Sequence, residues 1–168
     1  MKFYSQQQGF TLLEALIVVA IVAIGATIAV PSLVGFVNQT KLNSLKTLLV
    51  NDMNTARSEA IKSNVRVIAC AANSAATNCA TNTNWEVSGW LVCPAAGAAC
   101  DTTASAIIVR PPVTNGITLA ATNATVTFKP IGTALTTAAL AQQIVLTGKP
   151  GTKSITVNVA NTGSVSAQ

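Results

Sequence analysis

One long apolar run near the N-terminus constrains this chain more than any other feature. From Phe10 to Val30 the residues are apolar, with four exceptions: Thr11, Glu14, Gly25 and Thr27. About 20 helical residues at 1.5 Å each cross a bilayer core, so residues 10–30 are predicted to form one transmembrane helix. No small-residue cleavage site follows the run, so we do not expect a secretory signal peptide. Any cleavage is expected before the run, in the polar residues 1–9.

The helical pattern continues beyond the apolar run. Pro31 removes one helix hydrogen bond and is expected to bend the helix at or near that point. After it, apolar residues recur at spacings of three and four, which is typical of an amphipathic helix: Leu45, Leu48, Leu49, Met53, Ala56, Ala60 and Ile61. We therefore predict one helix from about Phe10 to Ser63, whose second half, residues 31–63, packs one stripe against a head domain.

The spacing of the apolar residues changes after Asn64. Short alternating or apolar runs separated by Gly- and Pro-containing turns predict strands: Val65–Cys70, Trp85–Cys93, Ala106–Arg110, Gly116–Leu119, Ala124–Lys129, Gln143–Leu146 and Ser154–Val159. Trp85 and Trp90 are the largest candidates for the core. The predicted fold class is α+β, with a long N-terminal helix on a β-rich head over residues 64–168.

The charged residues argue against an enzyme. The chain has no histidine and only five acidic residues, which removes the usual Ser-His and Cys-His bases and most catalytic zinc sites. We predict no catalytic residue, no cofactor and no metal site. The net charge is +5 and no acidic residue follows Asp101, but the four cations beyond it are too well separated to form a dense patch.

Glu14 is the most unusual residue of the apolar run. A carboxylate near the middle of a membrane helix costs about 2.5–3.5 kcal/mol on insertion scales, so it is rarely present without a partner. Close to the helix end it could instead extend to the membrane interface. The composition alone does not choose between these two explanations.

The residues around Glu14 resemble a known signal. Gly9-Phe10-Thr11-Leu12-Leu13-Glu14 followed by a long apolar run is similar to the class III signal of type IV pilins and type II secretion pseudopilins. The resemblance implies that a prepilin peptidase cuts between Gly9 and Phe10 and that Phe10 is then N-methylated. Glu14 becomes the fifth mature residue and Pro31 the twenty-second, where many pilins have a helix-breaking proline.

The same resemblance implies a role for Glu14 in filament assembly. The new α-amino group of Phe10 is cationic near neutral pH, and a carboxylate is its natural counter-charge in a low-dielectric filament core. The implied partners are other pilin or pseudopilin subunits, the prepilin peptidase and the inner membrane. The implied location is the bacterial inner membrane, crossed once with the head in the periplasm, and then a pilus or pseudopilus.

A second resemblance narrows the family. Ala56–Lys62, Val65–Cys70 and the Trp85-x-x-x-Gly89-Trp90 stretch resemble the GspH/FimT group, and the similarity is clear over residues 9–93. It implies a GspH-like head of two sheets and the function of a minor pilin in type IV pilus assembly or initiation. The alternative is an H-type minor pseudopilin of a type II secretion system.

The four cysteines all lie beyond the apolar run. In an exported domain, Cys70, Cys79, Cys93 and Cys100 indicate disulfides, and the sequence permits three pairings. We favour Cys70 with Cys79 and Cys93 with Cys100, since each pairing closes a short loop between predicted strands and is worth about 2–3 kcal/mol. A four-cysteine zinc site is disfavoured because the spacings contain no Cys-x-x-Cys pair.

A DNA-binding pilus-tip subunit is the third hypothesis. Some FimT-like minor pilins bind DNA during transformation through a tail that reads Gly-Arg-x-Arg, but this chain has Gly163-Ser164-Val165-Ser166. An upstream Pro-x-Gly-Arg turn is replaced by Pro130-Ile131-Gly132-Thr133. The possible DNA contacts that remain are Lys149 and Lys153.

Overall fold

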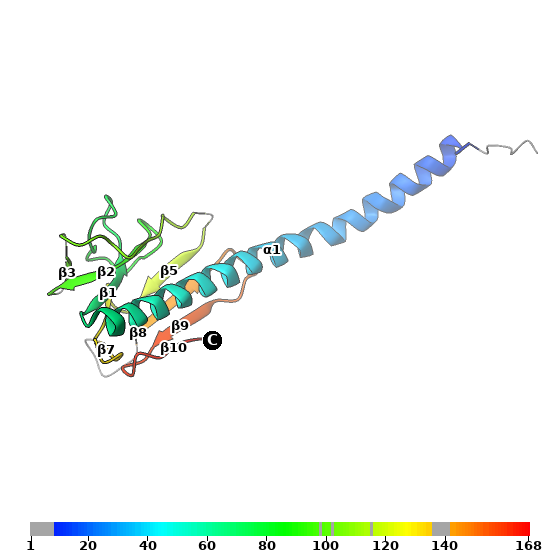
Figure 1. The fold of residues 1–168 in the computed structure, drawn as a ribbon. Coiled ribbons are helices and arrows are strands. Elements are labelled where there is room, and N and C mark those ends of the chain that lie inside the picture. The colour runs from blue at the N-terminus through cyan, green and yellow to red at the C-terminus, as the bar shows by residue number, and fades with distance from the viewer. Residues whose placement is uncertain (1–8, 98, 102, 115, 136–141) are drawn as a thin grey trace, which may run out of the picture. The chain divides into compact units, whose positions relative to one another are not determined.

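The computed structural model describes residues 9–97, 99–101, 103–114, 116–135 and 142–168. The chain forms two compact units, Met1–Val37 and Asn38–Gln168. One helix, α1 (Leu12–Ser63), contributes to both (Figure 1). We describe each unit on its own.

The first unit is a bare apolar helix. The large apolar side chains of α1 in this unit are exposed, from 41% at Val37 to 75% and more at Ile28 and Leu12. Among the described residues, α1 is the one helix long and apolar enough to span a membrane by length and composition. The backbone is helical through Pro31, so the proline does not end the helix.

The second half of α1 belongs to the head, where its apolar stripe is buried. The fully buried residues repeat at spacings of three, four and seven: Leu42, Leu49, Met53, Ala56 and Ala60. Leu45 and Leu48 lie beside the stripe and are half-buried. The prediction was wrong for Ile61, which is 52% exposed. It follows Ala60 directly, and about 100° per residue turns it away from the stripe.

The head contains two antiparallel sheets (Figure 1). The first has the order β3-β2-β1-β6-β7, with β4 paired to β2. The second has the order β10-β9-β8-β5. The strands of the first sheet are β1 (Val67–Ala71), β2 (Trp90–Ala96), β3 (Ala99–Cys100), β4 (Ile108–Val109), β6 (Thr125–Phe128) and β7 (Ala134–Leu135). Those of the second are β5 (Thr118–Ala121), β8 (Gln142–Thr147), β9 (Ile155–Val159) and β10 (Val165–Ala167).

Strand β1 is buried on both faces and separates two cores. Successive side chains of a strand point to opposite faces. Val67, Ala69 and Ala71 pack in the main core with α1 and the second sheet. Ile68 and Cys70 face a smaller core that also contains the other cysteines. The predicted α+β fold, with a helix on a two-sheet head, is confirmed.

The sequence placed the beginning of β2 too early. The prediction ran from Trp85, but residues 86–88 form a turn and the strand starts at Trp90. Gly89 has φ +80°, and a Cβ there would collide with the carbonyl oxygen of Arg110. This close approach needs a glycine and keeps the preceding residues out of the sheet. Trp85 and Trp90 are both buried, as expected.

Candidate functional sites

The expected processing site lies in an exposed segment just before the helix. Gly9 and Phe10 precede the helix and are exposed, and Phe10 is 79% exposed. Nothing would lie within 4 Å of a Cβ at Gly9. A peptidase could therefore reach this peptide bond without unfolding a secondary structure element.

Glu14 has a local role that the sequence analysis missed. The amide of Glu14 donates a hydrogen bond of 3.2 Å to the hydroxyl oxygen of Thr11, the residue immediately before α1. Thr11-x-x-Glu14 is the pattern of a capping box, and a carboxylate in the first turn also suits the helix dipole. The pattern is legible in the sequence. This local cap is separate from the role in filament assembly that the sequence predicts for Glu14.

A buried ion pair joins α1 to the first sheet. Asp52 is 2% exposed and accepts three hydrogen bonds: from Arg110 Nε and Nη2 at 2.8 Å each, and from Trp90 Nε1 at 3.0 Å. The hydrogen bonds to Asp52 raise the pKa of Arg110 above its ordinary value. The carboxylate is well satisfied by these donors. This cluster is a clamp that holds the helix on the sheet.

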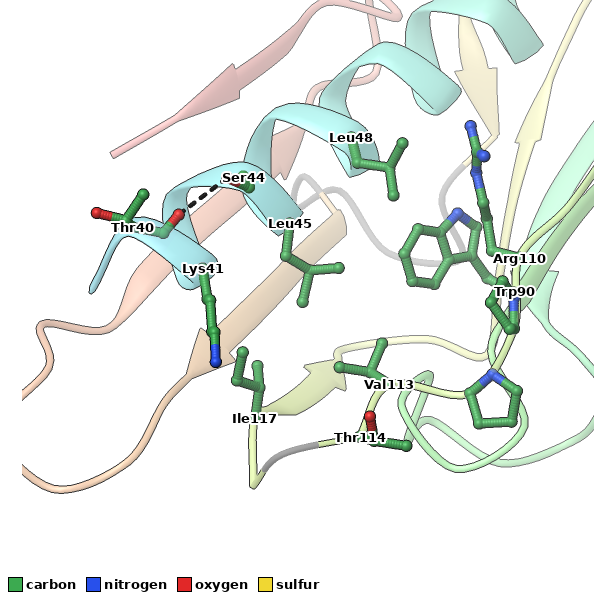
Figure 2. A pocket seen from close by; sticks show the side chains of 12 residues that line it. Thr40, Lys41, Ser44, Leu45, Leu48, Trp90, Arg110, Val113, Thr114 and Ile117 are labelled. Carbon is green, nitrogen blue, oxygen red and sulfur yellow. Dashed lines mark hydrogen bonds between the residues drawn. The ribbon is translucent and has the colours of Figure 1, made fainter. Parts of the chain in front are cut away.

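A groove of about 640 Å³ begins beside this clamp. In Figure 2, Leu45 and Leu48 of α1 face Val113 and Ile117, which belong to the segment between β4 and β5. Lys41 and Ile117 lie at one end, and Trp90 and Arg110 at the other. Most of the side chains between the two ends are apolar, and Ser44 and Thr114 are polar exceptions. The sequence analysis did not foresee this groove.

The cysteines form two disulfides in the smaller core. Cys70 is bonded to Cys79 and Cys93 to Cys100, the pairing that we favoured. The Sγ atoms of Cys79 and Cys100 lie 3.7 Å apart, so the two disulfides are in contact. Since all four sulfurs are in disulfide bonds, the cluster has no thiolate to offer a metal ion.

The two candidate DNA-binding lysines share one exposed turn. The amide of Lys153 donates a hydrogen bond of 2.8 Å to Oε1 of Gln39 in the head part of α1. The side chain of Lys149 lies against Gly116: its Cε and Cγ atoms would be 3.6 and 3.7 Å from a Cβ atom built on that glycine. The turn is therefore fixed beside the Lys41 end of the groove.

The two turns from which arginines are missing lie side by side. Arg57 Nε donates to the carbonyl oxygen of Gly132 at 2.9 Å, and its Nη2 donates to that of Thr162 at 3.4 Å. A Cβ at Gly163, where φ is +80°, would collide with the oxygen of Gly132. In this chain Arg57 holds together two turns that carry Thr133 and Ser164 instead of arginine.

The family follows from comparison with known proteins. A family model described as type II transport protein GspH matches residues 47–163, and the prokaryotic N-terminal methylation motif matches residues 4–30. The chain belongs to the GspH family. It is accordingly a subunit of the minor pilin and pseudopilin class, and the family assignment made from the sequence is confirmed. No curated protein sequence matches the chain.

Two crystal structures of the type IV minor pilin FimU from Pseudomonas aeruginosa have the same fold. One is 14% identical, covers 75% of this chain and 91% of that one, and has a TM-score of 0.56. The other is 15% identical, covers 79% and 92%, and has a TM-score of 0.61. At these identities the likeness shows the fold of the GspH-type pilin head.

Proposed function

We propose that the chain is a minor pilin, a structural subunit without enzymatic activity that takes part in assembly or initiation of a type IV pilus. The observation that carries the proposal is the combination of a methylation motif on a bare apolar helix with a head that has the FimU fold. Such a helix is a membrane anchor before assembly and a filament core afterwards. Its large apolar side chains need one of these two environments.

The proposed processing and division of the chain follow from this function. Residues 1–9 are a leader that a prepilin peptidase removes between Gly9 and Phe10, and Phe10 is then N-methylated. Residues 10–30 are the transmembrane segment, residues 31–63 continue the helix into the head, and residues 64–168 are the rest of the head. Glu14 and Pro31 belong to the filament-forming part. The head is in the periplasm while the helix is in the inner membrane.

Mass spectrometry of the chain isolated from filaments tests this function directly. We expect a mature protein that has lost residues 1–9 and carries one added methyl group on Phe10. We also expect the chain at a low copy number relative to the main filament subunit. An intact Met1, or absence of the chain from purified filaments, would contradict the proposal.

A minor pseudopilin of a type II secretion system is the second candidate. The observation that favours it is the description of the matching family itself, type II transport protein GspH. Deleting the chain separates the two candidates. If the chain is a minor pilin, its deletion should abolish surface pili and leave protein export unchanged. If it is a minor pseudopilin, its deletion should block the export of folded proteins.

A further inference from the structure

The groove beside α1 has walls that are fixed before anything binds to it. On the loop wall, the amide of Arg110 donates to the carbonyl of Trp90 at 2.8 Å, and that of Val113 donates to the carbonyl of Glu86 at 2.9 Å. The ion pair between Arg110 and Asp52 ties this wall to the helix at one end. The groove is therefore preorganised, so less conformational entropy is lost when it is occupied.

The interior of the groove is apolar and incompletely covered. Leu45, Leu48, Val113 and Ile117 pack on the main core but are only half-buried. Pro111 and Pro112 line the same wall and have no amide hydrogen to offer. Such a surface suits an aliphatic or aromatic side chain better than a polar one.

The charged side chains among the described lining residues, Lys41 and Arg110, are both basic. Lys41 lies in its lining, and the fixed turn with Lys149 and Lys153 lies beside the same end. No acidic side chain is among the described lining residues, and Arg110 at the other end is neutralised by Asp52. The open end therefore favours an occupant with negative charge.

A second copy of this chain does not offer such an occupant. Each of the four acidic side chains of the head accepts a hydrogen bond within its own chain: Asp52 from Arg110, Glu59 from Lys62, Glu86 from the Leu119 amide and Asp101 from Thr103. The bonds from the Thr103 hydroxyl and amide hold the pKa of Asp101 below its ordinary value. A segment of another protein, whose carboxylate has no such partner to give up, is therefore the better occupant.

We propose that the groove docks a segment from the head of a different filament subunit, one with an aliphatic or aromatic side chain and a neighbouring carboxylate. The apolar side chain fills the groove, and the carboxylate lies at the end with Lys41, Lys149 and Lys153. This docking rests on the proposed function, and it names the surface by which the head meets its neighbour. Duplex DNA fits less well, because phosphates need no apolar groove.

Photo-crosslinking in cells with the full-length chain tests the docking. A benzophenone amino acid replaces Thr114, an exposed residue of the groove lining, and the same replacement at the 78% exposed Ile131, outside the lining, is the matched control. We expect position 114 to crosslink to another filament subunit, in a peptide with an acidic residue within about two positions of the attachment. Position 131 should not give this product.

A charge reversal sharpens the test. Lys41→Glu should lower the crosslinking yield about fivefold, the effect of losing one exposed ion pair. Lys62→Glu, at a lysine that is 78% exposed at the other end of the helix, should leave the yield unchanged. Crosslinks to lipid or DNA only, no crosslink, or full yield with Lys41→Glu would overturn the docking proposal.

Purified filaments from the same cells separate this proposal from the proposed function. If the unmodified chain is absent from filaments, the minor pilin function fails. If it is present and position 114 gives no subunit crosslink, the docking proposal alone fails.

Discussion

The two units of this chain differ in whether the chain itself buries their apolar side chains. In the first unit the large side chains of α1 stay exposed, as at Leu12 and Ile28. In the second unit the same helix buries a stripe from Leu42 to Ala60 against two sheets. One continuous helix thus has a half that needs an environment from outside the chain and a half that the chain itself covers.

The two units also differ in where their acidic groups lie and in how these groups are bonded. In the head, the buried Asp52 has three donors, and two disulfides close the smaller core. In the first unit, the acidic group of the described residues is Glu14, whose amide bonds to Thr11. Variants in the first unit should therefore change assembly and leave head stability intact, and variants of the buried groups of the head should change head stability.

Glu14→Ala is expected to give the largest effect. The carboxylate is lost as the counter-charge of a neighbouring α-amino group in a low-dielectric core, so incorporation into filaments should fall more than tenfold, which corresponds to about 1.4 kcal/mol or more. Quantitative immunoblotting of purified filaments against the membrane pool measures this. The thermal unfolding of the head should not change.

Two matched variants separate charge from capping at the same site. Glu14→Gln keeps a side chain that can complete a capping box but removes the charge. Thr11→Ala removes the cap and keeps the charge. We expect Glu14→Gln to fail in incorporation like Glu14→Ala and Thr11→Ala to assemble nearly normally; the opposite order would make capping the role of Glu14.

Arg110→Met should give the largest loss of head stability. It leaves the buried Asp52 with one donor, Trp90 Nε1, and breaking a buried ion pair in this way costs about 3–5 kcal/mol. We expect the lower end of that range, since the Arg110 side chain is 34% exposed. Denaturant unfolding of the full chain in detergent, followed by tryptophan fluorescence, provides the measurement.

Lys62→Met is the control for the clamp variant. It removes an exposed ion pair with Glu59 at i,i+3 spacing, which is worth at most about 0.5 kcal/mol. If Arg110→Met costs no more than Lys62→Met, the clamp does not hold the helix on the sheet.

The paired substitution Cys70→Ala/Cys79→Ala is expected to have a smaller effect. The disulfide joins residues with a sequence separation of 9, and the loop-entropy model gives about 2.7 kcal/mol for its loss. The pair Cys93→Ala/Cys100→Ala, with a separation of 7, should cost slightly less. Membrane association of the helix should be unaffected by both, and its loss would show that the units do not act independently.

Local sequence patterns predicted the features that depend on near neighbours. The helix was expected from about Phe10 to Ser63 and is observed over Leu12–Ser63. The cysteine pairing was also predicted correctly, because each disulfide closes a short loop. By contrast, Asp52 and Arg110 are 58 positions apart, and nothing in either local pattern joins them. The one available signal was a lone Asp inside the apolar stripe of the helix, which calls for a buried partner.

The remaining differences arise from backbone contacts between distant segments. The start of β2 depends on Gly89 lying against Arg110, and two turns meet at Gly132 and Gly163. The short strands β3, β7 and β10 exist because a partner strand lies beside them. Tertiary pairing of this kind leaves little trace in local propensity. The groove was missed for the same reason, since its walls are separated in the sequence.

The smallest expected effect concerns DNA, and it belongs to the head alone. The arginines of the DNA-binding tail are absent, so any contact with duplex DNA should be made by lysines, which act as point charges on phosphates. Lys149 and Lys153 share one fixed turn, so they neutralise about two phosphates. We therefore expect weak binding with a log–log salt slope of about −2.

A fluorescence titration of the full-length chain in detergent at several salt concentrations measures this slope. Lys149→Ala/Lys153→Ala should abolish the binding, whereas Lys62→Ala, at an exposed lysine of the helix end, should leave it unchanged. A third lysine, Lys41, lies in the groove whose end adjoins this turn, and its participation would steepen the slope to about −3. Tight binding that survives both the double substitution and raised salt would place the DNA site elsewhere. It would also show that the positive end of the groove serves nucleic acid no better than the rest of the head surface.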